Sequence, residues 1–380
     1  MADKIKINPK PEEIDKIVYN SDASTIKGEV SKVIFPKTIG EIESLIRTET
    51  NMVPRGAGSG LAGGAVPQNS IVIDLSKMNK ILEVDKTKKI AYVETGIILD
   101  ELQEALKKYD LEFPVNPSSH GFCSIGGMIA TNAVGSRAVK YGRTCDWVQS
   151  IEVIDGHGNL KKIGKLDMMD FCGMEGITGI IVRATLNLSP IKKRSADLVK
   201  ADDIRDIMEA VKRIKPDSEV SMIEFFDKTT SILLGLEEKY HLLIEYESYK
   251  GNLHDKEYNK IMKTRDNAYP VLADKGYTII EDPKMLTAKI PELVKWLEEK
   301  RIPFFGHIGV GIIHPCFKPE QQELIDEMFW VVKKLQGQIT GEHGIGLSKK
   351  KYLEPNDKKI IEIVKKRHDP ANKLNKGKIL

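Results

Sequence analysis

The chain has 380 residues, of which 41% are hydrophobic and 30% are charged, and its formal net charge is +3. This length exceeds what a single core usually supports, so we expect two domains with enough apolar residues for a soluble fold. The lysines are scattered along the chain, which argues against the clustered basic surface of a nucleic-acid-binding protein.

The first half of the chain shows alternating strand and helix patterns. A strand is predicted over 31–36, and Thr38 with Glu41 forms a capping box that opens a helix. Leucines at helical spacing predict another helix over 99–110. The remaining strands are expected at 69–76, at 88–96, in a hairpin over 151–163, and at 179–190, where proline ends the pattern. We place the first domain boundary near Pro190.

The second half has the pattern of an α/β module. Strands are predicted at 220–226 and 241–248, and helices at 202–214, 229–240, 254–275, 291–300 and 319–335. We assign residues 1–190 to the first domain, 191–335 to the second, and 336–380 to a C-terminal segment that returns to the first.

A glycine-rich run, VPRGAGSGLAGGAVP at residues 53–67, is the strongest motif. Gly58, Gly60 and Gly63 satisfy GxGxxG, but a Rossmann site needs a helix to follow, and Pro67 and the next strand come too soon. We therefore predict a helix-free loop whose backbone amides form a nest for a pyrophosphate. The alternative is a glycine-rich loop with a purely structural role.

Two further segments are rich in small residues: NPSSHGFCSIGGMIATNAVGSRAVKYGRTCDWV at 116–148 and MEGITGIIVRATL at 174–186. Small side chains let the backbone approach a flat ligand closely, as a flavin ring requires.

Together these segments and ITGEHGIGL at 339–347 resemble, in order and spacing, the FAD-linked 2-hydroxyacid oxidoreductases. This is the glycolate oxidase and D-lactate dehydrogenase group of the vanillyl-alcohol oxidase superfamily. The resemblance implies an α+β fold with a two-part, PCMH-type FAD-binding domain, and an α/β substrate cap with an antiparallel sheet. It also implies non-covalent FAD, because the first loop carries no histidine for covalent attachment.

The resemblance assigns FAD-binding residues by position. Those expected at the pyrophosphate are Arg55, Gly56, Ala57, Gly58, Ser59, Gly60 and Leu61. Those expected along the adenosine and flavin portions are Pro117, Ser118, Gly126, Gly127, Thr131, Asn132, Gly135, Tyr141, Gly142, Glu175, Gly176, Gly179, Ile180 and Ile181.

Members of this group commonly carry HxGDGNxH and a later GEHG. This chain keeps His307, His314, Glu342 and His343. Two imidazoles and one carboxylate form an open ligand set for zinc or another divalent ion, which could bind the substrate, with His343 as general base. However, Val310 and Ile312 replace the usual Asp and Asn. A metal-free site or buried core histidines are therefore the alternative, and His343 could be merely structural.

Arg265 resembles an arginine of this group that follows a tryptophan, although the tryptophan is absent. A guanidinium suits a substrate carboxylate, so Arg265 is a candidate catalytic residue. The alternative is a solvated helix face.

The resemblance implies oxidation of a small D-2-hydroxyacid, D-lactate or glycolate, to the 2-oxoacid. The electron acceptor would be a quinone, an electron-transfer flavoprotein, a partner subunit or oxygen, and a homodimer is one expected assembly. Two alternatives are an auxiliary FAD-binding subunit of a multisubunit glycolate oxidase and an alditol or sugar-lactone oxidase.

Cys123, Cys145, Cys172 and Cys316 are far apart and form no CxxC pair, so we expect reduced thiols and no iron–sulfur cluster. The run MADKIKINPKPEE has no apolar signal-peptide core, and no apolar run reaches the roughly 18 residues of a membrane helix. We expect a cytoplasmic protein without a transmembrane segment, with peripheral membrane association as an alternative.

Overall fold

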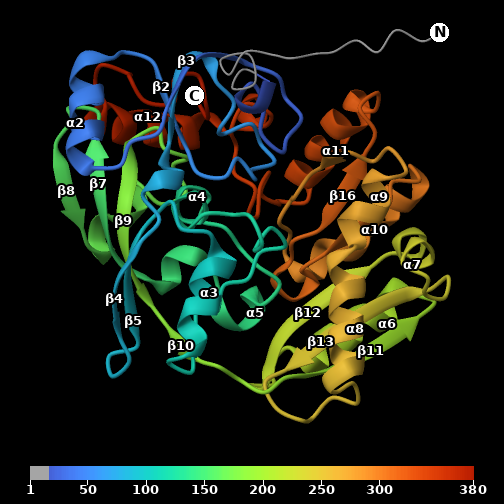
Figure 1. Cartoon of the computed structure of the whole chain (residues 1–380). Coiled ribbons are helices and arrows are strands. Elements are labelled where there is room, and N and C mark those ends of the chain that lie inside the picture. Colours follow the sequence, from blue (N-terminus) through green and yellow to red (C-terminus); the bar gives the residue numbers. More distant parts are fainter. Residues whose placement is uncertain (1–16) are drawn as a thin grey trace, which may run out of the picture.

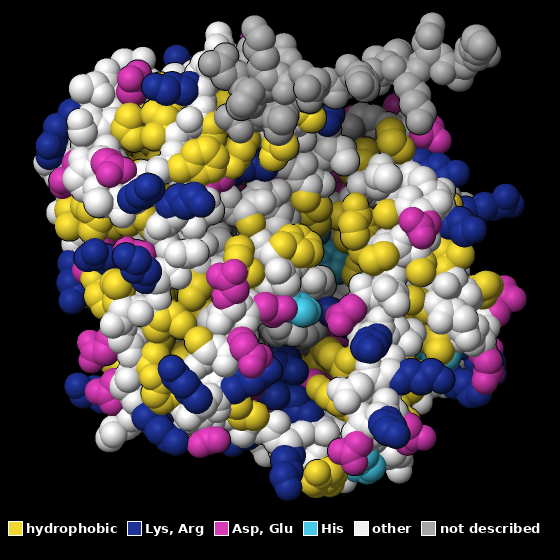
Figure 2. All heavy atoms as spheres, in the orientation of Figure 1, with side chains coloured by type: hydrophobic (Ala, Val, Ile, Leu, Met, Phe, Trp, Pro, Cys, Tyr) yellow, Lys and Arg dark blue, Asp and Glu magenta, His cyan; other side chains and the backbone are white. Residues whose placement is uncertain are grey.

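The computed structural model describes residues 17–380, so the run in which we predicted no signal peptide lies outside the described part. Two groups of strands and helices lie side by side, and the C-terminal helix α12 (Pro355–His368) lies with the N-terminal group (Figure 1). The face turned to the viewer is hollowed between the groups, and histidine side chains are visible there (Figure 2). Within residues 17–380, no helix is both long and apolar enough to cross a bilayer.

The N-terminal group is built on a five-stranded antiparallel sheet in the order β4-β5-β9-β7-β8. Its strands are β4 (Ile81–Asp85), β5 (Ile90–Glu94), β9 (Gly179–Asn187), β7 (Val148–Asp155) and β8 (Leu160–Ile163). Strands β7 and β8 form the predicted hairpin. Helix α3 (Leu99–Lys107) contributes the predicted leucines, Leu99, Leu102 and Leu106, to the core beneath this sheet.

A smaller parallel sheet has the order β1-β3-β2 and consists of β1 (Glu29–Ile34), β3 (Gln68–Asp74) and β2 (Met52–Arg55). Between β1 and β2, helix α2 (Ile39–Thr48) begins where predicted, and the Thr38 side chain accepts a hydrogen bond from the Glu41 N–H. The glycine-rich run joins β2 to β3 without a helix. The structure thus confirms a loop rather than a Rossmann turn.

The second group is built on a six-stranded sheet in the order β11-β13-β12-β15-β16-β14, with antiparallel pairing as predicted for the cap. The strands are β11 (Ser195–Ala201), β13 (Tyr240–Tyr246), β12 (Val220–Phe226), β15 (Phe304–Gly306), β16 (His314–Phe317) and β14 (Ile279–Ile280). One apolar core includes residues of α6 (Ile204–Ile214), α10 (Ile290–Glu299) and α11 (Gln322–Lys334). Another includes residues of α8 (Asp255–Asp266) and α9 (Ala268–Ala273). Strands β12 and β13 are buried along their whole length because both faces of the sheet are covered.

The connections contain short elements. They are the paired strands β6 (Leu111–Glu112) and β10 (Ser189–Pro190), the helices α4 (Ile125–Thr131), α5 (Ala138–Tyr141) and α7 (Lys228–Leu233), and 3-10 turns at Leu75–Lys77, Thr144–Trp147, Lys165–Asp170, Thr287–Lys289, Ile308–Val310 and Lys350–Tyr352.

Two helix predictions are wrong in extent. The single helix expected over 254–275 is interrupted at Asn267, because Pro270 has no N–H to continue the hydrogen-bond ladder back to residue 266. The helix expected over 229–240 ends at Leu233, where Gly235 takes a positive φ of 76° and its N–H bonds the carbonyl of Ile232.

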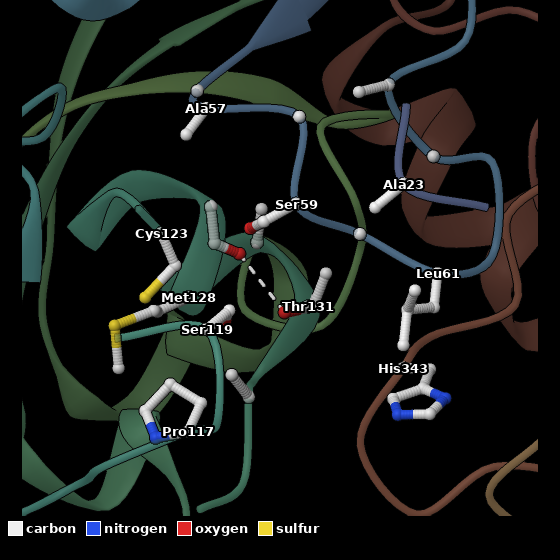
Figure 3. A pocket seen from close by; sticks show the side chains of 18 of the residues that line it. Ala23, Ala57, Ser59, Leu61, Pro117, Ser119, Cys123, Met128, Thr131 and His343 are labelled. Atoms are coloured by element: carbon white, nitrogen blue, oxygen red, sulfur yellow. Dashed lines mark hydrogen bonds between the residues drawn. The ribbon is translucent and has the colours of Figure 1, made fainter. Parts of the chain in front are cut away.

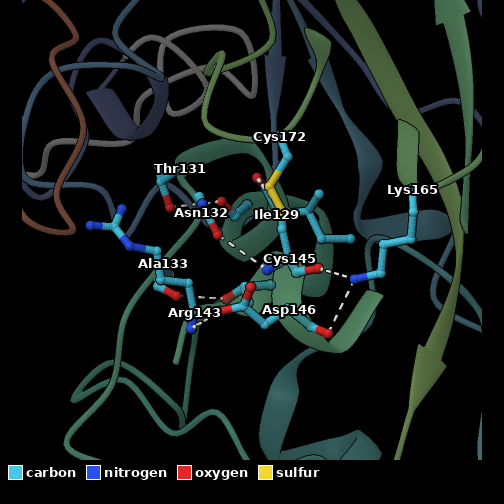
Figure 4. Close-up of a disulfide and its surroundings, with 11 residues drawn as sticks. Ile129, Thr131, Asn132, Ala133, Arg143, Cys145, Asp146, Lys165 and Cys172 are labelled. Atoms are coloured by element: carbon cyan, nitrogen blue, oxygen red, sulfur yellow. Dashed lines mark hydrogen bonds between the residues drawn. A yellow bond between two sulfur atoms is a disulfide. The ribbon is translucent and has the colours of Figure 1, made fainter. Parts of the chain in front are cut away.

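The expectation of four reduced cysteines is also wrong. Cys145 and Cys172 form a disulfide, with Cα atoms 6.6 Å apart, whereas Cys123 and Cys316 are free and buried (Figure 4). Both partners are held against α4: the Cys145 N–H donates to the Asn132 side chain, and the Gly173 N–H donates to the Ile129 carbonyl. The two cysteines are 27 residues apart in the sequence, and this spacing did not indicate that they lie close together.

Candidate active site

The glycine loop and the C-terminal loop that carries His343 border one cavity of about 480 Å³. Residues of the segments 117–134, 175–181 and 266–280, together with Phe305 and His314, complete its wall. Figure 3 shows Ala57 and Ser59 of the glycine loop at one side of this cavity and Leu61 beside His343 at the other. The cavity therefore joins the predicted cofactor loop to the predicted catalytic histidine.

The glycine loop has the features of an anion-binding nest. Within the part of the chain that the structure describes, the backbone N–H groups of residues 57–61 have no hydrogen-bond acceptor. A Cβ on Gly60 would meet no atom within 4 Å, and Gly58 has a positive φ of 69°. Free amides on a loop that borders a cavity suit the phosphate oxygens of a pyrophosphate.

Arg55, which the resemblance places at the pyrophosphate, hydrogen-bonds the chain next to the glycine loop. Its guanidinium donates to the carbonyls of Ser21 and Ala65, at 2.9 and 3.4 Å. The Ala65 N–H in turn donates to the buried carboxylate of Asp22. Arg55 lines the cavity, and its hydrogen bonds connect the start of the loop to Ala65 near its end and to Ser21.

The opposite wall is shaped by close backbone contacts. A Cβ on Gly56 would lie 2.1 Å from the Ser124 Oγ, and one on Gly126 would lie 2.9 Å from the Thr95 side chain. Only glycine permits these approaches, which bring the loop to the N-cap of α4 and bring α4 to the segment after β5, beside a space suited to a flat ring.

Glu175 joins this wall to the His343 loop. It is 6% exposed, and one carboxylate oxygen accepts hydrogen bonds from the N–H groups of Ile345 and Gly346, at 2.6 and 3.2 Å. Its other oxygen has no partner. Burial raises the pKa of this carboxyl to about 7, against the lowering effect of the two amides.

Most residues assigned to FAD line the cavity. They are Arg55, Gly56, Ala57, Gly58, Ser59, Gly60, Leu61, Pro117, Ser118, Gly126, Gly127, Thr131, Glu175, Gly176, Gly179 and Ile181. The free amides, the glycine approaches and the shape of the wall fit an extended dinucleotide such as FAD.

The other assigned residues lie outside the cavity wall and support it. The Asn132 side chain accepts from Cys145, and the Tyr141 hydroxyl donates to Glu247. Gly135 approaches the Asn116 backbone, Gly142 approaches Asp146, and Ile180 is in the core.

The structure brings His307, His314 and Glu342 together. One potential ligand atom from each lies within 4.8 Å of the other two. The Glu342 carboxylate lies 3.2 Å from the His314 Nε2 and 3.5 Å from the His307 Nε2. This set fits a divalent ion by residue type and spacing.

Other groups orient the two histidines. The His307 Nδ1 bonds the Glu224 carboxylate at 2.5 Å, which leaves its Nε2 toward Glu342. Burial lowers the pKa of His307, but Glu224 and Glu342 outweigh this effect and raise it to about 10. The His314 Nδ1 lies 3.3 Å from the carbonyl of Glu281. Carboxylate and carbonyl partners of this kind are typical behind metal-binding imidazoles.

His343 lies beside this cluster. Its Nε2 is 3.1 Å from the Glu342 carboxylate and its Nδ1 is 3.6 Å from Asp282. The rings of His314 and His343 stack with centroids 5.2 Å apart. Burial lowers the pKa of His343, but Asp282 and Glu342 outweigh it, so the pKa is above its usual value.

Asp282 holds the His343 loop in place, and sequence reasoning missed it. Its carboxylate accepts from the Thr340 hydroxyl and from the backbone N–H groups of residues 341–343, at 2.6–2.9 Å. Buried Lys349 pairs with it. Burial raises the pKa of Asp282, but Lys349 and the other donors outweigh this effect and lower it to about 2. The adjacent acids Glu281 and Asp282 after an apolar pair were the available signal.

Arg265 is buried and does not line the cavity. Its Nε donates to Glu224 at 2.9 Å and its Nη1 to Asp266 at 3.1 Å, while its Nη2 has no partner. Through Glu224 it supports His307.

Val310 and Ile312, where the sequence departs from the family pattern, belong to a small apolar cluster with Val134 and Ala138. Both side chains face the α4–α5 region of the other group of elements and lie outside the cavity wall. Their apolar character therefore leaves the geometry of His307, His314 and Glu342 intact.

Two family models match this chain. The FAD binding domain matches residues 30–164, and the C-terminal domain of FAD linked oxidases matches residues 250–379. A solved structure of alkyldihydroxyacetonephosphate synthase superposes with a TM-score of 0.67 at 17% identity, covering 93% of this chain and 77% of that one. This likeness concerns the fold.

Named relatives span nearly the whole chain. D-2-hydroxyglutarate dehydrogenase of Stutzerimonas stutzeri is 28% identical over 92% of this chain and 90% of its own length. The glycolate oxidase subunit GlcD of Bacillus subtilis is 29% identical, covering 96% and 92%. D-lactate dehydrogenase of Archaeoglobus fulgidus is 27% identical, covering 92% and 91%.

Proposed function

The chain belongs to the FAD-linked oxidases, and from this premise we propose that it oxidises a small D-2-hydroxyacid, such as D-lactate or glycolate, to the 2-oxoacid. One observation carries the proposal: His314, Glu342 and His343 line the end of the cavity that begins at the glycine loop, and His307 lies next to His314 and Glu342. The relatives named for D-2-hydroxyacid substrates are consistent with it.

The residues that line the cavity would hold FAD, with the free amides of residues 57–61 at the pyrophosphate. Bound FAD supplies the acceptor for the hydride that leaves the substrate's α-carbon. The small residues of α4 and of the loop before it let the backbone approach the ring system and exclude water from it.

His307, His314 and Glu342 would hold a divalent cation such as zinc. Such an ion would supply a Lewis acid for the substrate's carboxylate and hydroxyl oxygens. Glu224, supported by Arg265, would keep the His307 Nε2 aimed at this position.

His343 would take the substrate's hydroxyl proton. Its imidazole is close to the proposed ligand Glu342, and Asp282 fixes its loop through three backbone hydrogen bonds. A base held in one position at hydrogen-bond reach of the substrate is what general base catalysis requires.

A second candidate function is that of an FAD-binding subunit within a multisubunit glycolate oxidase. The relative named as subunit GlcD favours it. The electron acceptor, a homodimer and a cytoplasmic or membrane-peripheral location stay predictions.

An anaerobic substrate panel tests the proposal. Purified protein reconstituted with FAD is mixed with D-2-hydroxyacids, glycolate, alditols and a sugar lactone while the flavin absorbance is followed. Bleaching by a 2-hydroxyacid is expected, and its loss after a chelator, with recovery on adding zinc, would support the ion. A flavin that only alditols or sugars reduce would contradict the proposal.

A further inference from the structure

Next to the histidine cluster, the cavity wall contributed by residues 266–305 is largely apolar. Phe305 on β15 pairs with His314 on β16, and their ring centroids are 5.1 Å apart. His314 also stacks on His343, so the His314 ring contacts both Phe305 and the proposed base. An aromatic face thus borders the place where the substrate's α-carbon would react.

Ile280, Tyr269 and Leu61 extend this apolar surface. All three line the cavity and belong, with Phe305, to one apolar cluster. The Tyr269 hydroxyl donates to the carbonyl of Thr278, so its polar end is already occupied and the ring remains as contact surface. Leu61 lies close to His343 (Figure 3).

The charges at this end of the cavity are unfavourable for a second anionic group. Asp266 is an acidic residue that lines the cavity, whereas Arg265 beside it is buried, does not line the cavity and donates hydrogen bonds to Glu224 and Asp266. Lys349 is also buried, within ion-pair distance of Asp282 and of Glu281. Among the described residues that line the cavity from 266 to 343, none is a lysine or an arginine.

Resting on the proposed function, we infer that the substrate is a 2-hydroxyacid with an alkyl side chain, and that Asp266 rejects a second carboxylate. One carboxylate of the substrate can be met at the His307, His314 and Glu342 site. A second would have to leave water for an apolar wall that contains no lysine or arginine, next to the acidic side chain of Asp266. An apolar substrate side chain would contact Phe305, Ile280 and Tyr269. In a hydrophobic pocket, one methylene typically changes the preference between two substrates by about 10- to 200-fold.

The test compares matched substrates on the FAD-loaded protein. The rate constant of anaerobic flavin reduction divided by the dissociation constant is measured for D-lactate, D-2-hydroxybutyrate, D-2-hydroxyisocaproate and D-2-hydroxyglutarate. We expect this quotient to be about 10-fold or more larger for D-2-hydroxybutyrate than for D-2-hydroxyglutarate. Binding of 2-oxobutyrate and 2-oxoglutarate, followed by perturbation of the flavin spectrum, should show the same order without turnover.

Asp266→Asn removes the negative charge from a side chain that is 44% exposed, so the fold should tolerate it. The rate constant of flavin reduction divided by the dissociation constant is compared for the two acids. Its ratio, D-2-hydroxyglutarate over D-2-hydroxybutyrate, should rise about 10-fold in this variant. Asp274→Asn, on an exposed residue just after α9 and away from the cavity wall, is the matched control and should leave the ratio unchanged.

The outcomes separate the two proposals. If D-2-hydroxyglutarate reduces the flavin best, the alkyl preference is overturned and the proposed oxidation of 2-hydroxyacids stands. If Asp266→Asn leaves the ratio unchanged, Asp266 is not the discriminating residue. If no 2-hydroxyacid reduces the flavin, the proposed function falls and this inference falls with it.

Discussion

His343 is useful as a base only if its neighbours hold it in place. Its loop is fixed through Asp282, and its ring is stacked on His314. Asp282 hydrogen-bonds the backbone of the loop and not the imidazole, so replacing the His343 side chain should leave the loop, the fold and bound FAD in place.

His343→Ala should therefore keep FAD bound but slow flavin reduction by about 10² or more, the usual scale for a lost acid–base catalyst. Stopped-flow reduction with the best substrate of the panel measures this. His157→Ala, in the exposed turn of the β7–β8 hairpin, serves as control. Unchanged reduction in His343→Ala would remove this residue from the mechanism.

Glu175 predicts a pH-dependent stability. Its carboxyl has a pKa raised to about 7 by burial, whereas in the unfolded chain it would titrate near its ordinary value of about 4.3. Between these values the folded protein keeps a proton that the unfolded chain has lost. Stability is therefore lost as the pH rises through this window.

Glu175→Gln cannot ionise, so the free energy of unfolding of the variant relative to the parent should rise by roughly 2 kcal/mol between pH 5 and pH 8. Urea unfolding with saturating FAD at both pH values measures it. Glu209→Gln, on the exposed face of α6, is the control. A pH-independent difference would show that Glu175 is ionised throughout.

For individual residues, the sequence predicted which side chains lie together in the site where residue type alone determines the chemistry. The spacing of His307 and His314 and the GEHG run named the residues that the structure gathers. The roles of Asp282 and Glu224 could not be predicted from residue type, because each depends on which loop packs against the carboxylate, and the adjacent acids Glu281 and Asp282 were only a weak signal. Val310 and Ile312 stand where the family usually has Asp and Asn. In the structure they pack against Val134 and Ala138.

Helix α2 shows how a local signal fixes an element. Thr38 caps its first turn, and Ile42 and Ile46 on the opposite face are fully buried. Caps and amphipathic spacing are properties of a few adjacent residues, so such elements could be predicted. Helices α7 and α9 differed from prediction because a glycine turn and a proline interrupted an otherwise helical pattern.

Thr38→Ala should lower the free energy of unfolding by about 1 kcal/mol, since the N–H of Glu41 loses its acceptor. Chemical denaturation measures the change. Thr38→Ser retains the hydroxyl and should stay close to the parent. A loss of similar size in both variants would point to the Thr38 methyl group rather than to the cap.

Across the whole molecule, the C-terminal tail joins parts of the site that are far apart in the sequence. The Asn375 side chain donates to the carbonyls of Gly64 and Glu175, at 2.8 and 2.7 Å, and the Ile379 N–H donates to the carbonyl of Gly346. The tail thereby connects the glycine loop, the Glu175 segment and the His343 loop. The Asn375 contacts span 200 residues or more and leave no local pattern in the sequence, so they could not be predicted from it. The Cys145–Cys172 disulfide spans only 27 residues, but it depends on how both segments pack and was not predicted either.

Asn375→Gly should weaken FAD binding by about 10-fold or more. The variant keeps a backbone that tolerates the positive φ of 45° at this position, but it leaves two carbonyls without their donor. Each lost hydrogen bond costs about 0.5–1.5 kcal/mol, and 1.4 kcal/mol corresponds to a tenfold change in affinity. Asn372→Gly is a close control, because Asn372 also has a positive φ, of 50°, and is exposed. Titration of the apoproteins with FAD, followed by fluorescence, compares them. Equal affinity in both variants would show that the tail does not hold the glycine loop in its binding conformation.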